Sequence, residues 1–127
     1  MEFTVSTVIK ATPSQIYQAW LNSSQHSEMT GGEAIVSDKV GQTFTAWDGY
    51  ITGVNLALVS DKHIIQDWRT SEFTDEEENS HIEIDLEEDG DGTRITLAHT
   101  NLPEHGMQYE QGWIDNYFEP MKTFFEK

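Results

Sequence analysis

The sequence contains no cysteine among its 127 residues. This absence excludes disulfide bonds, thiol nucleophiles and any zinc or iron–sulfur site built from cysteine ligands. The sequence also lacks a run of roughly 18 apolar residues, so no segment is predicted to span a membrane. Its first ten residues alternate in polarity and lack the basic flank and apolar run of a signal peptide. Together these features predict a cytoplasmic protein.

Basic residues are scarce as well. Seven Lys and Arg stand against 23 Asp and Glu, which gives a formal net charge of −16 at pH 7. Nucleic acids and anionic membranes are bound through cationic surfaces that release counterions, so neither is expected as a partner. The acidic residues gather in two runs, Asp75 to Glu78 and Glu87 to Asp91, which we interpret as solvated loops between strands.

The length and the 36% hydrophobic content predict one domain, residues 1–127, with a single core. Most of the chain alternates apolar and polar residues with a period of two, which is typical of strands with one wet face. Asp-Gly pairs between these segments indicate tight turns. The predicted strands are Glu2–Lys10, Ala34–Ser37, Thr43–Trp47, Tyr50–Val59, His63–Thr70, Ser80–Glu87 and Thr93–Thr100.

Two segments have a helical pattern instead. The first begins at Thr12, which can cap a helix with Pro13 at its first position and Gln15 completing a capping box. Its apolar stripe comprises Ile16, Tyr17, Trp20 and Leu21, and a polar connector from Asn22 to Met29 follows, with room for a second helical turn.

The second helix runs from about Met107 to the end of the chain. Its stripe comprises Tyr109, Trp113, Tyr117, Met121 and Phe124. Pro120 inside it is expected to kink the helix or end its first segment. The order of elements predicts an α+β fold in which a curved antiparallel sheet of about six or seven strands wraps around a long C-terminal helix.

The sequence offers little for metal or acid–base chemistry. Residues 85–96 resemble a calcium loop, but Thr96 occupies the position where a bidentate Glu is needed. The five histidines show no paired metal-ligand spacing, so no metal site, cofactor or catalytic residue is assigned. His99 continues the inward face of its strand and is either an acid–base group or a structural histidine bonded to backbone or to a buried tyrosine.

The aromatic residues are the most informative feature. They either fill the core or line an incompletely filled cavity beneath the long helix, with a few polar groups for orientation. The candidate ligand-binding residues are Trp20, Phe44, Gln66, Trp68, Leu97, His99, Trp113, Tyr117 and Met121.

Several short motifs occur in a fixed order. They are Met29–Gly31, Gly41–Phe44, Trp47–Gly53 with its D-G-x-I-x-G pattern, His63–Arg69, and Gln111–Trp113 leading to Phe124-Phe125. In this order they resemble the C-terminal-domain family of the heat-shock-protein-90 ATPase activators, within the START-like (SRPBCC) superfamily. The resemblance covers Val8 to Phe125 and implies a helix-grip fold with a cavity between the sheet and the helix.

The resemblance leaves three functions open. The first is non-catalytic binding of a small hydrophobic, lipid-like or polyketide-like aromatic ligand in that cavity. The second is a chaperone-associated or stress-response interaction module. The third is a small enzyme of the cyclase or dehydratase type, for which no branch-specific catalytic motif can be placed on this sequence.

Overall fold

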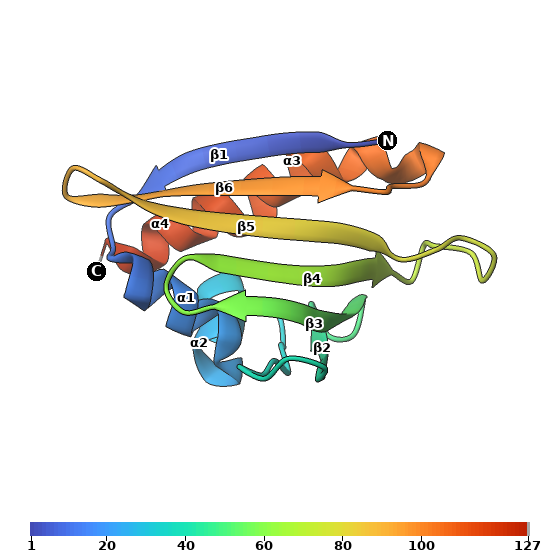
Figure 1. The fold of residues 1–127 in the computed structure, drawn as a ribbon, viewed down its shortest axis with the longest axis horizontal. Helices are drawn as coiled ribbons and strands as arrows, with labels where there is room; N and C mark the ends of the chain where they lie inside the picture. The colour runs from blue at the N-terminus through green and yellow to red at the C-terminus, as the bar shows by residue number, and fades with distance from the viewer. Residues whose placement is uncertain (127) are drawn as a thin grey trace.

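The computed structural model describes residues 1–126. Its six strands form one antiparallel sheet in the order β1-β6-β5-β4-β3-β2. The helices all lie on one side of this sheet (Figure 1). The strands are β1 (Phe3–Ile9), β2 (Thr43–Ala46), β3 (Ile51–Val59), β4 (His63–Thr70), β5 (Ser80–Asp89) and β6 (Gly92–Thr100). The predicted helix-grip architecture is therefore confirmed.

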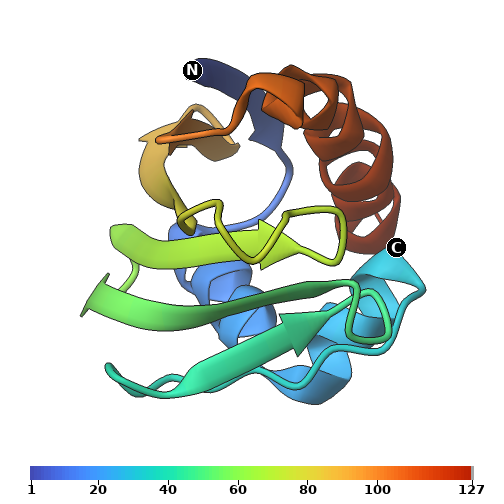
Figure 2. The same ribbon diagram turned by 90° about the vertical axis from the view of Figure 1, so that its right-hand side faces the viewer.

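The strands alternate between a buried and a solvent-facing side. In β5, Ile82 and Ile84 are buried while His81 and Glu83 are exposed, as the period of two predicts. Trp68 of β4 also faces inward, because the register shift of this region falls between Asn55 and Ala57 of β3 and leaves β4 regular. Figure 2 shows the sheet curving, so that its inner face can enclose a core.

Helix α1 (Pro13–Leu21) forms as predicted. The Thr12 side chain accepts a hydrogen bond from the backbone N–H of Gln15, and the Gln15 side chain accepts one from the N–H of Thr12. This capping box satisfies two of the free backbone donors at the helix start. Ile16 and Trp20 then point into the core, whereas Tyr17 is only half buried.

The polar connector is in fact a complete helix, α2 (Ser23–Thr30). The Asn22 side chain caps it by accepting from the N–H of Gln25, and Gly31 ends it with a φ of 90°. Glycine adopts this left-handed conformation without a steric penalty, which makes it a common helix stop. Because the segment is short of apolar residues, its periodicity could not reveal the helix.

The prediction of a strand at Ala34–Ser37 was wrong, since only a single bridge joins Ile35 to Thr45. The side chains of α2 take the place of a neighbouring strand. The N–H of Ala34 donates to Ser27 Oγ, and the N–H of Val36 donates to Ser23 Oγ. Backbone N–H groups that are hydrogen-bonded to serine hydroxyls do not need to pair with a neighbouring strand.

The C-terminal helix begins with a 3₁₀ turn, η1 (Glu104–Gln108), and continues as α3 (Tyr109–Trp113), η2 (Ile114–Phe118) and α4 (Glu119–Phe125). The η2 segment is a π-helical turn, in which the N–H of Glu119 donates to the carbonyl of Ile114. Pro120 lies in the first turn of α4, so the expected interruption at the proline takes the form of this π turn and the helix continues beyond it. A wider turn before a proline accommodates the ring that would clash with the preceding α-helical turn.

The π turn also rotates the apolar stripe. Phe118, which the four-residue spacing did not include, is fully buried, whereas Phe124 is only half buried at the edge of the core. A π turn takes up an extra residue, so every later side chain is displaced around the helix axis. Within residues 1–126, no helix is long and apolar enough to cross a membrane.

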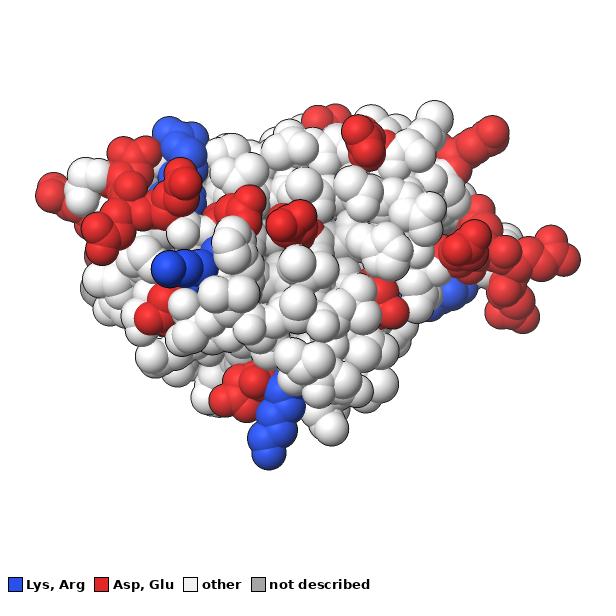
Figure 3. Space-filling model, viewed as in Figure 1, with Lys and Arg blue, Asp and Glu red and all other residues white. Residues whose placement is uncertain are grey.

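The acidic residues gather at two ends of the molecule, where Figure 1 places the β4–β5 loop and the β5–β6 hairpin (Figure 3). Like charges held close together in the folded state repel each other, and salt screens this repulsion. We expect the thermal unfolding midpoint to rise between roughly 10 mM and 150 mM NaCl, a range in which the screening length falls from about 30 Å to about 8 Å. Calorimetry at both salt concentrations tests this, and a flat or falling midpoint would contradict it.

Candidate functional site

A pocket of about 340 Å³ lies between the inner face of the sheet and the first turns of the C-terminal helix. Its size is at the lower end of the range of small-molecule sites, about 300–1,000 Å³. Six of its nine lining residues are aromatic, and none of the nine carries a formal charge. The lining residues are Trp47, Tyr50, Ile51, Trp68, Tyr109, Gly112, Trp113, Asn116 and Tyr117.

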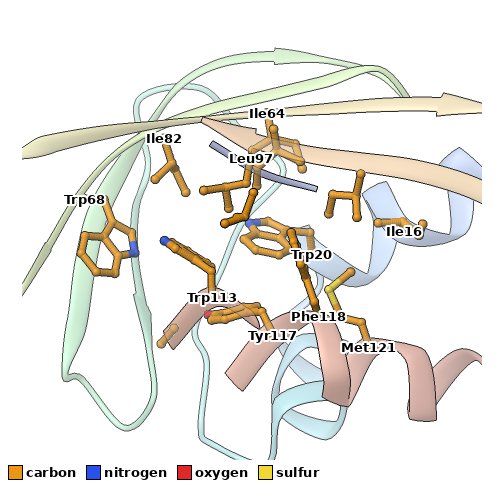
Figure 4. Close-up of a cluster of buried hydrophobic side chains, with 14 of the residues drawn as sticks. Ile16, Trp20, Ile64, Trp68, Ile82, Leu97, Trp113, Tyr117, Phe118 and Met121 are labelled. Atoms are coloured by element: carbon orange, nitrogen blue, oxygen red, sulfur yellow. The ribbon is translucent and has the colours of Figure 1, made fainter. Parts of the chain in front are cut away.

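The back wall of the pocket is a group of buried rings. Trp68 of β4 lies 5.6 Å from Trp113 of α3, and Trp113 lies 4.8 Å from Tyr117, measured between ring centroids. Tyr109 closes the same wall, 4.9 Å from Trp68. Figure 4 shows Trp68 opposite Trp113 and Tyr117, which reach toward it from the helix. Each ring is packed on at least one of the others, so the wall is held in place before any ligand arrives.

The opposite side of the pocket comes from the turn between β2 and β3. Trp47 has a φ of 51° and Asp48 a φ of 60°, a left-handed conformation that bulky side chains rarely adopt. Two hydrogen bonds hold this turn: the N–H of Glu33 donates to Asp48 Oδ1, and the N–H of Asp48 donates to the carbonyl of Glu33. The Trp47 ring lies against Gly32, where a Cβ would approach it to 2.5 Å. Backbone strain of this kind tends to collect at functional sites.

Gly112 is the other unusual position in the lining. A Cβ placed there would meet only Asn116 Nδ2, at 3.8 Å, which is ordinary contact. By contrast, a Cβ at Gly53 or Gly106 would overlap neighbouring atoms. Glycine inside a helix costs about 0.5–1 kcal/mol relative to alanine. Packing does not require a glycine at position 112, and its effect is to leave the pocket free.

A buried hydrogen-bond chain fixes the back wall. Trp113 Nε1–H donates to His99 Nδ1 at 3.0 Å, and His99 Nε2–H donates to Ser80 Oγ at 2.8 Å. The Ser80 hydroxyl in turn donates to the carbonyl of Trp68 at 2.7 Å. Burial, together with a smaller effect of the nearby His81, lowers the pKa of His99 to about 3. His99 is therefore a neutral structural group. Its partners are Trp113 and Ser80, whereas the sequence predicted a backbone group or a buried tyrosine.

A second buried histidine holds Tyr117. His26 Nδ1–H donates to the carbonyl of Trp20 at 2.8 Å, and the Tyr117 hydroxyl donates to His26 Nε2 at 3.0 Å. Burial lowers the pKa of His26 and raises the pKa of Tyr117, so both stay neutral. The sequence gives no signal for His26, because this residue lies in a polar segment without an apolar period.

The predicted site residues separate into two groups. Trp68, Trp113 and Tyr117 line the pocket. The others are buried in the packed core, where Trp20 Nε1–H donates to Gln66 Oε1 at 3.4 Å and Gln66 Nε2 donates to Asn55 Oδ1 at 2.8 Å. The predicted residues that do not line the pocket are Trp20, Phe44, Gln66, Leu97, His99 and Met121.

The pocket residues that the sequence analysis did not select are Trp47, Tyr50, Ile51, Tyr109, Gly112 and Asn116. Two signals for them were present in the sequence. The D-G-x-I-x-G motif contains Tyr50 and Ile51 and adjoins Trp47, and Tyr109 belongs to the helical stripe. What the sequence did not show is that the turn and the helix face each other.

The outer face of the sheet carries a separate polar cluster. His63 Nδ1 contacts Asp85 across the β4–β5 pairing, and Glu83 lies beside them, with potential ligand atoms within 4.8 Å of one another. Because all three side chains reach solvent, this cluster is explained as a surface contact of small energetic value.

A family model and a curated relative point to the same protein family. Residues 10–126 match the model of the family described as Activator of Hsp90 ATPase homolog 1-like protein. The chain is 25% identical over 118 residues to an Activator of 90 kDa heat shock protein ATPase homolog from Dictyostelium discoideum. That match covers 91% of this chain and 30% of the relative's length.

Solved structures share the fold. An HSP90 activator from Plasmodium falciparum superposes with a TM-score of 0.88 at 19% identity, covering 99% of this chain and 96% of that one. The Aha1 dimer from Colwellia psychrerythraea gives a TM-score of 0.82 at 16% identity, covering 98% and 96% of the two chains. At these identities the likeness concerns the architecture alone.

Proposed function

The chain belongs to the family of Activator of Hsp90 ATPase homolog 1-like proteins, and within this family we propose that it binds a small hydrophobic or aromatic ligand without catalysis. The ligand occupies the pocket between the sheet and the C-terminal helix. The observation that carries this proposal is the half-open aromatic pocket, whose rigid back wall is fixed by the His99 and His26 hydrogen bonds. A preformed apolar site of this kind is the usual form of a small-molecule site.

The size of the expected affinity follows from the buried area. A ligand ring that buries ~150 Å² gains ~4 kcal/mol at ~25 cal/mol per Å² before ordering costs are subtracted. Micromolar binding needs about 8 kcal/mol, so stacking must be joined by further apolar contact and at least one polar contact. Asn116 and the tyrosine hydroxyls of the lining are the available groups.

Gly112 provides the test. We expect Gly112→Phe to fill the pocket and to weaken binding of the neutral fluorescent probe N-phenyl-1-naphthylamine at least tenfold. Gly112→Ala is the matched control: it should bind the probe as the parent protein does and gain about 0.5–1 kcal/mol of stability, because alanine favours the helix. Fluorescence titration and denaturant unfolding measure the two quantities.

Two results would count against the ligand-binding proposal. One is an unchanged probe affinity in a folded Gly112→Phe variant, which would place the probe elsewhere. The other is failure of the parent protein to bind the neutral probe at all.

A second function is favoured by the curated relative. Its name identifies an activator of the 90-kDa heat-shock-protein ATPase, and the match extends over 91% of this chain. We propose a contact with that chaperone as the alternative, in which this chain supplies one module of the activity. The test is the ATP hydrolysis rate of the purified chaperone with and without this protein, and an unchanged rate together with no detectable binding would rule this function out.

A further inference from the structure

One carboxylate lies against the aromatic walls of the pocket. Glu72 Oε2 accepts hydrogen bonds from the hydroxyls of Tyr50, at 2.6 Å, and Tyr109, at 3.2 Å. Both tyrosines line the pocket, so the negative charge of Glu72 lies at the hydroxyl ends of two lining side chains. These hydrogen bonds lower the pKa of Glu72 and keep it ionised. The start of the β4–β5 loop, which carries Glu72, is held by Thr70 Oγ1. This oxygen accepts a hydrogen bond from the N–H of Glu72 and forms another with the Tyr109 hydroxyl.

The described lining of the pocket provides no positive charge, and His105, which lies near enough to Glu72 to help lower its pKa, contacts Glu77 Oε1. Among the described residues, the lining includes no lysine, arginine or histidine. The nearby Arg69 is engaged elsewhere, because it donates to the carbonyl of Thr74 and to Asn79 Oδ1. The whole chain carries −16. A ligand carboxylate would therefore lose its hydration in the pocket without gaining a counter-charge.

A positively charged ligand meets the opposite situation. Aromatic faces attract cations through their quadrupoles, most strongly for tryptophan and when the cation is desolvated. Trp47, Trp68 and Trp113 all present surface to this pocket. Glu72 at the edge adds a full negative charge close to the same space, and the acidic surface raises the local concentration of cations.

Building on the ligand-binding function proposed above, we infer that the pocket selects an aromatic ammonium cation, with Glu72 as its counter-ion. The ligand's ring stacks on the back wall, and its ammonium group lies against the tyrosine rings at the end of the pocket nearest the carboxylate. Neutral aromatic compounds bind more weakly, and aromatic or fatty carboxylates are disfavoured. Charge, in addition to shape, thus defines the ligand class.

Three probes with one ring system separate these effects: (1-naphthylmethyl)trimethylammonium, 1-naphthylmethanol and 1-naphthylacetate. Titration calorimetry with the whole chain at low salt should show the cation binding about tenfold more tightly than the alcohol, the factor expected of one desolvated cation–π contact. The anion should bind most weakly. Raising the NaCl concentration should narrow the difference in affinity between the cation and the anion, because salt screens the charge of the exposed Glu72.

Glu72→Gln tests the counter-ion. The amide oxygen can still accept from both tyrosines, so the pocket keeps its shape while losing the charge. We expect cation affinity to fall about fivefold, which one lost ion pair near the surface can produce, and the affinity for 1-naphthylmethanol to stay unchanged. Glu76→Gln is the matched control, because it replaces an exposed glutamate of the same loop and changes the net charge by the same amount. It should leave the affinities for the cation and for 1-naphthylmethanol unchanged.

The outcomes are distinguishable. Equal affinities for cation, alcohol and anion would overturn the charge selectivity and leave the ligand-binding function intact. Equal losses of cation affinity in Glu72→Gln and Glu76→Gln would show a general charge effect and overturn the role of Glu72. Failure of all three probes to bind would overturn both proposals.

Discussion

Trp113→Ala is expected to lower the free energy of unfolding by about 3–5 kcal/mol, the cost of removing a large buried aromatic side chain. Trp113 is 3% exposed and contacts rings from both the sheet and the helices, Trp68, Trp20 and Tyr117 among them. The substitution opens a cavity at the centre of the molecule. It also leaves His99 Nδ1 buried without its donor, which adds to the loss.

Two variants separate the contributions. Trp113→Phe keeps most of the apolar volume but removes the indole N–H, so its loss should approach the cost of one buried unsatisfied acceptor, about 1–3 kcal/mol. Phe124→Ala, at a half-buried position of the same helix, should cost less than Trp113→Ala because less surface leaves water there. Urea unfolding measures all three. A loss below about 1 kcal/mol for Trp113→Ala, well under the usual range, would mean that the helix does not grip the sheet.

The second large effect is expected in acid. Burial lowers the pKa of His99 to about 3 in the folded protein, against an ordinary value near 6.5 that applies when the chain is unfolded. Between these two pH values, His99 therefore binds a proton in the unfolded state but not in the folded state. His99 contributes no penalty above about pH 6.5, and below it the folded state loses stability as pH falls, down to pH 3. The slope is about 1.4 kcal/mol per pH unit.

Other groups titrate in the same range, so the measurement is a comparison. We expect the free energy of unfolding of the parent protein, minus that of His99→Gln, to fall by about 2–3 kcal/mol between pH 6.5 and 4.5. His26, whose pKa burial also lowers, remains in both proteins and cancels. The variant itself should be less stable at neutral pH, because Trp113 and Ser80 lose their partner. If the unfolding free energies of the two proteins changed in parallel with pH, folding would not lower the pKa of His99.

Local features of the fold could be predicted from the sequence because their causes lie within a few residues. The capping box of Thr12 and Gln15 involves only the helix start, and the alternation of Ile82 with Glu83 follows from the pleat of a strand. The family motifs indicated the helix-grip architecture for the same reason: they record turns and strand faces in a fixed order.

The errors arose where a distant group or an irregular helical turn replaced a simple local rule. Ala34–Ser37 has strand character, but the serines of α2 satisfy its backbone. The four-residue spacing of the last helix predicted a simple stripe, but the π turn before Pro120 brings Phe118 into the core. The first effect cannot be seen from a window of neighbouring residues, and the second breaks the regular period on which such a window relies.

The order of residues along the chain is enough to establish which face of each strand is apolar and where the acidic charge gathers. Which aromatic side chains fill the core and which surround a space depends on how the folded elements meet. Trp20 and Trp68 are both buried, yet only Trp68 borders the pocket, because the turn carrying Trp47 and the helix carrying Gly112 meet beside it. An empty volume depends on how side chains from remote segments pack against one another, and that packing exists only when the whole chain has folded.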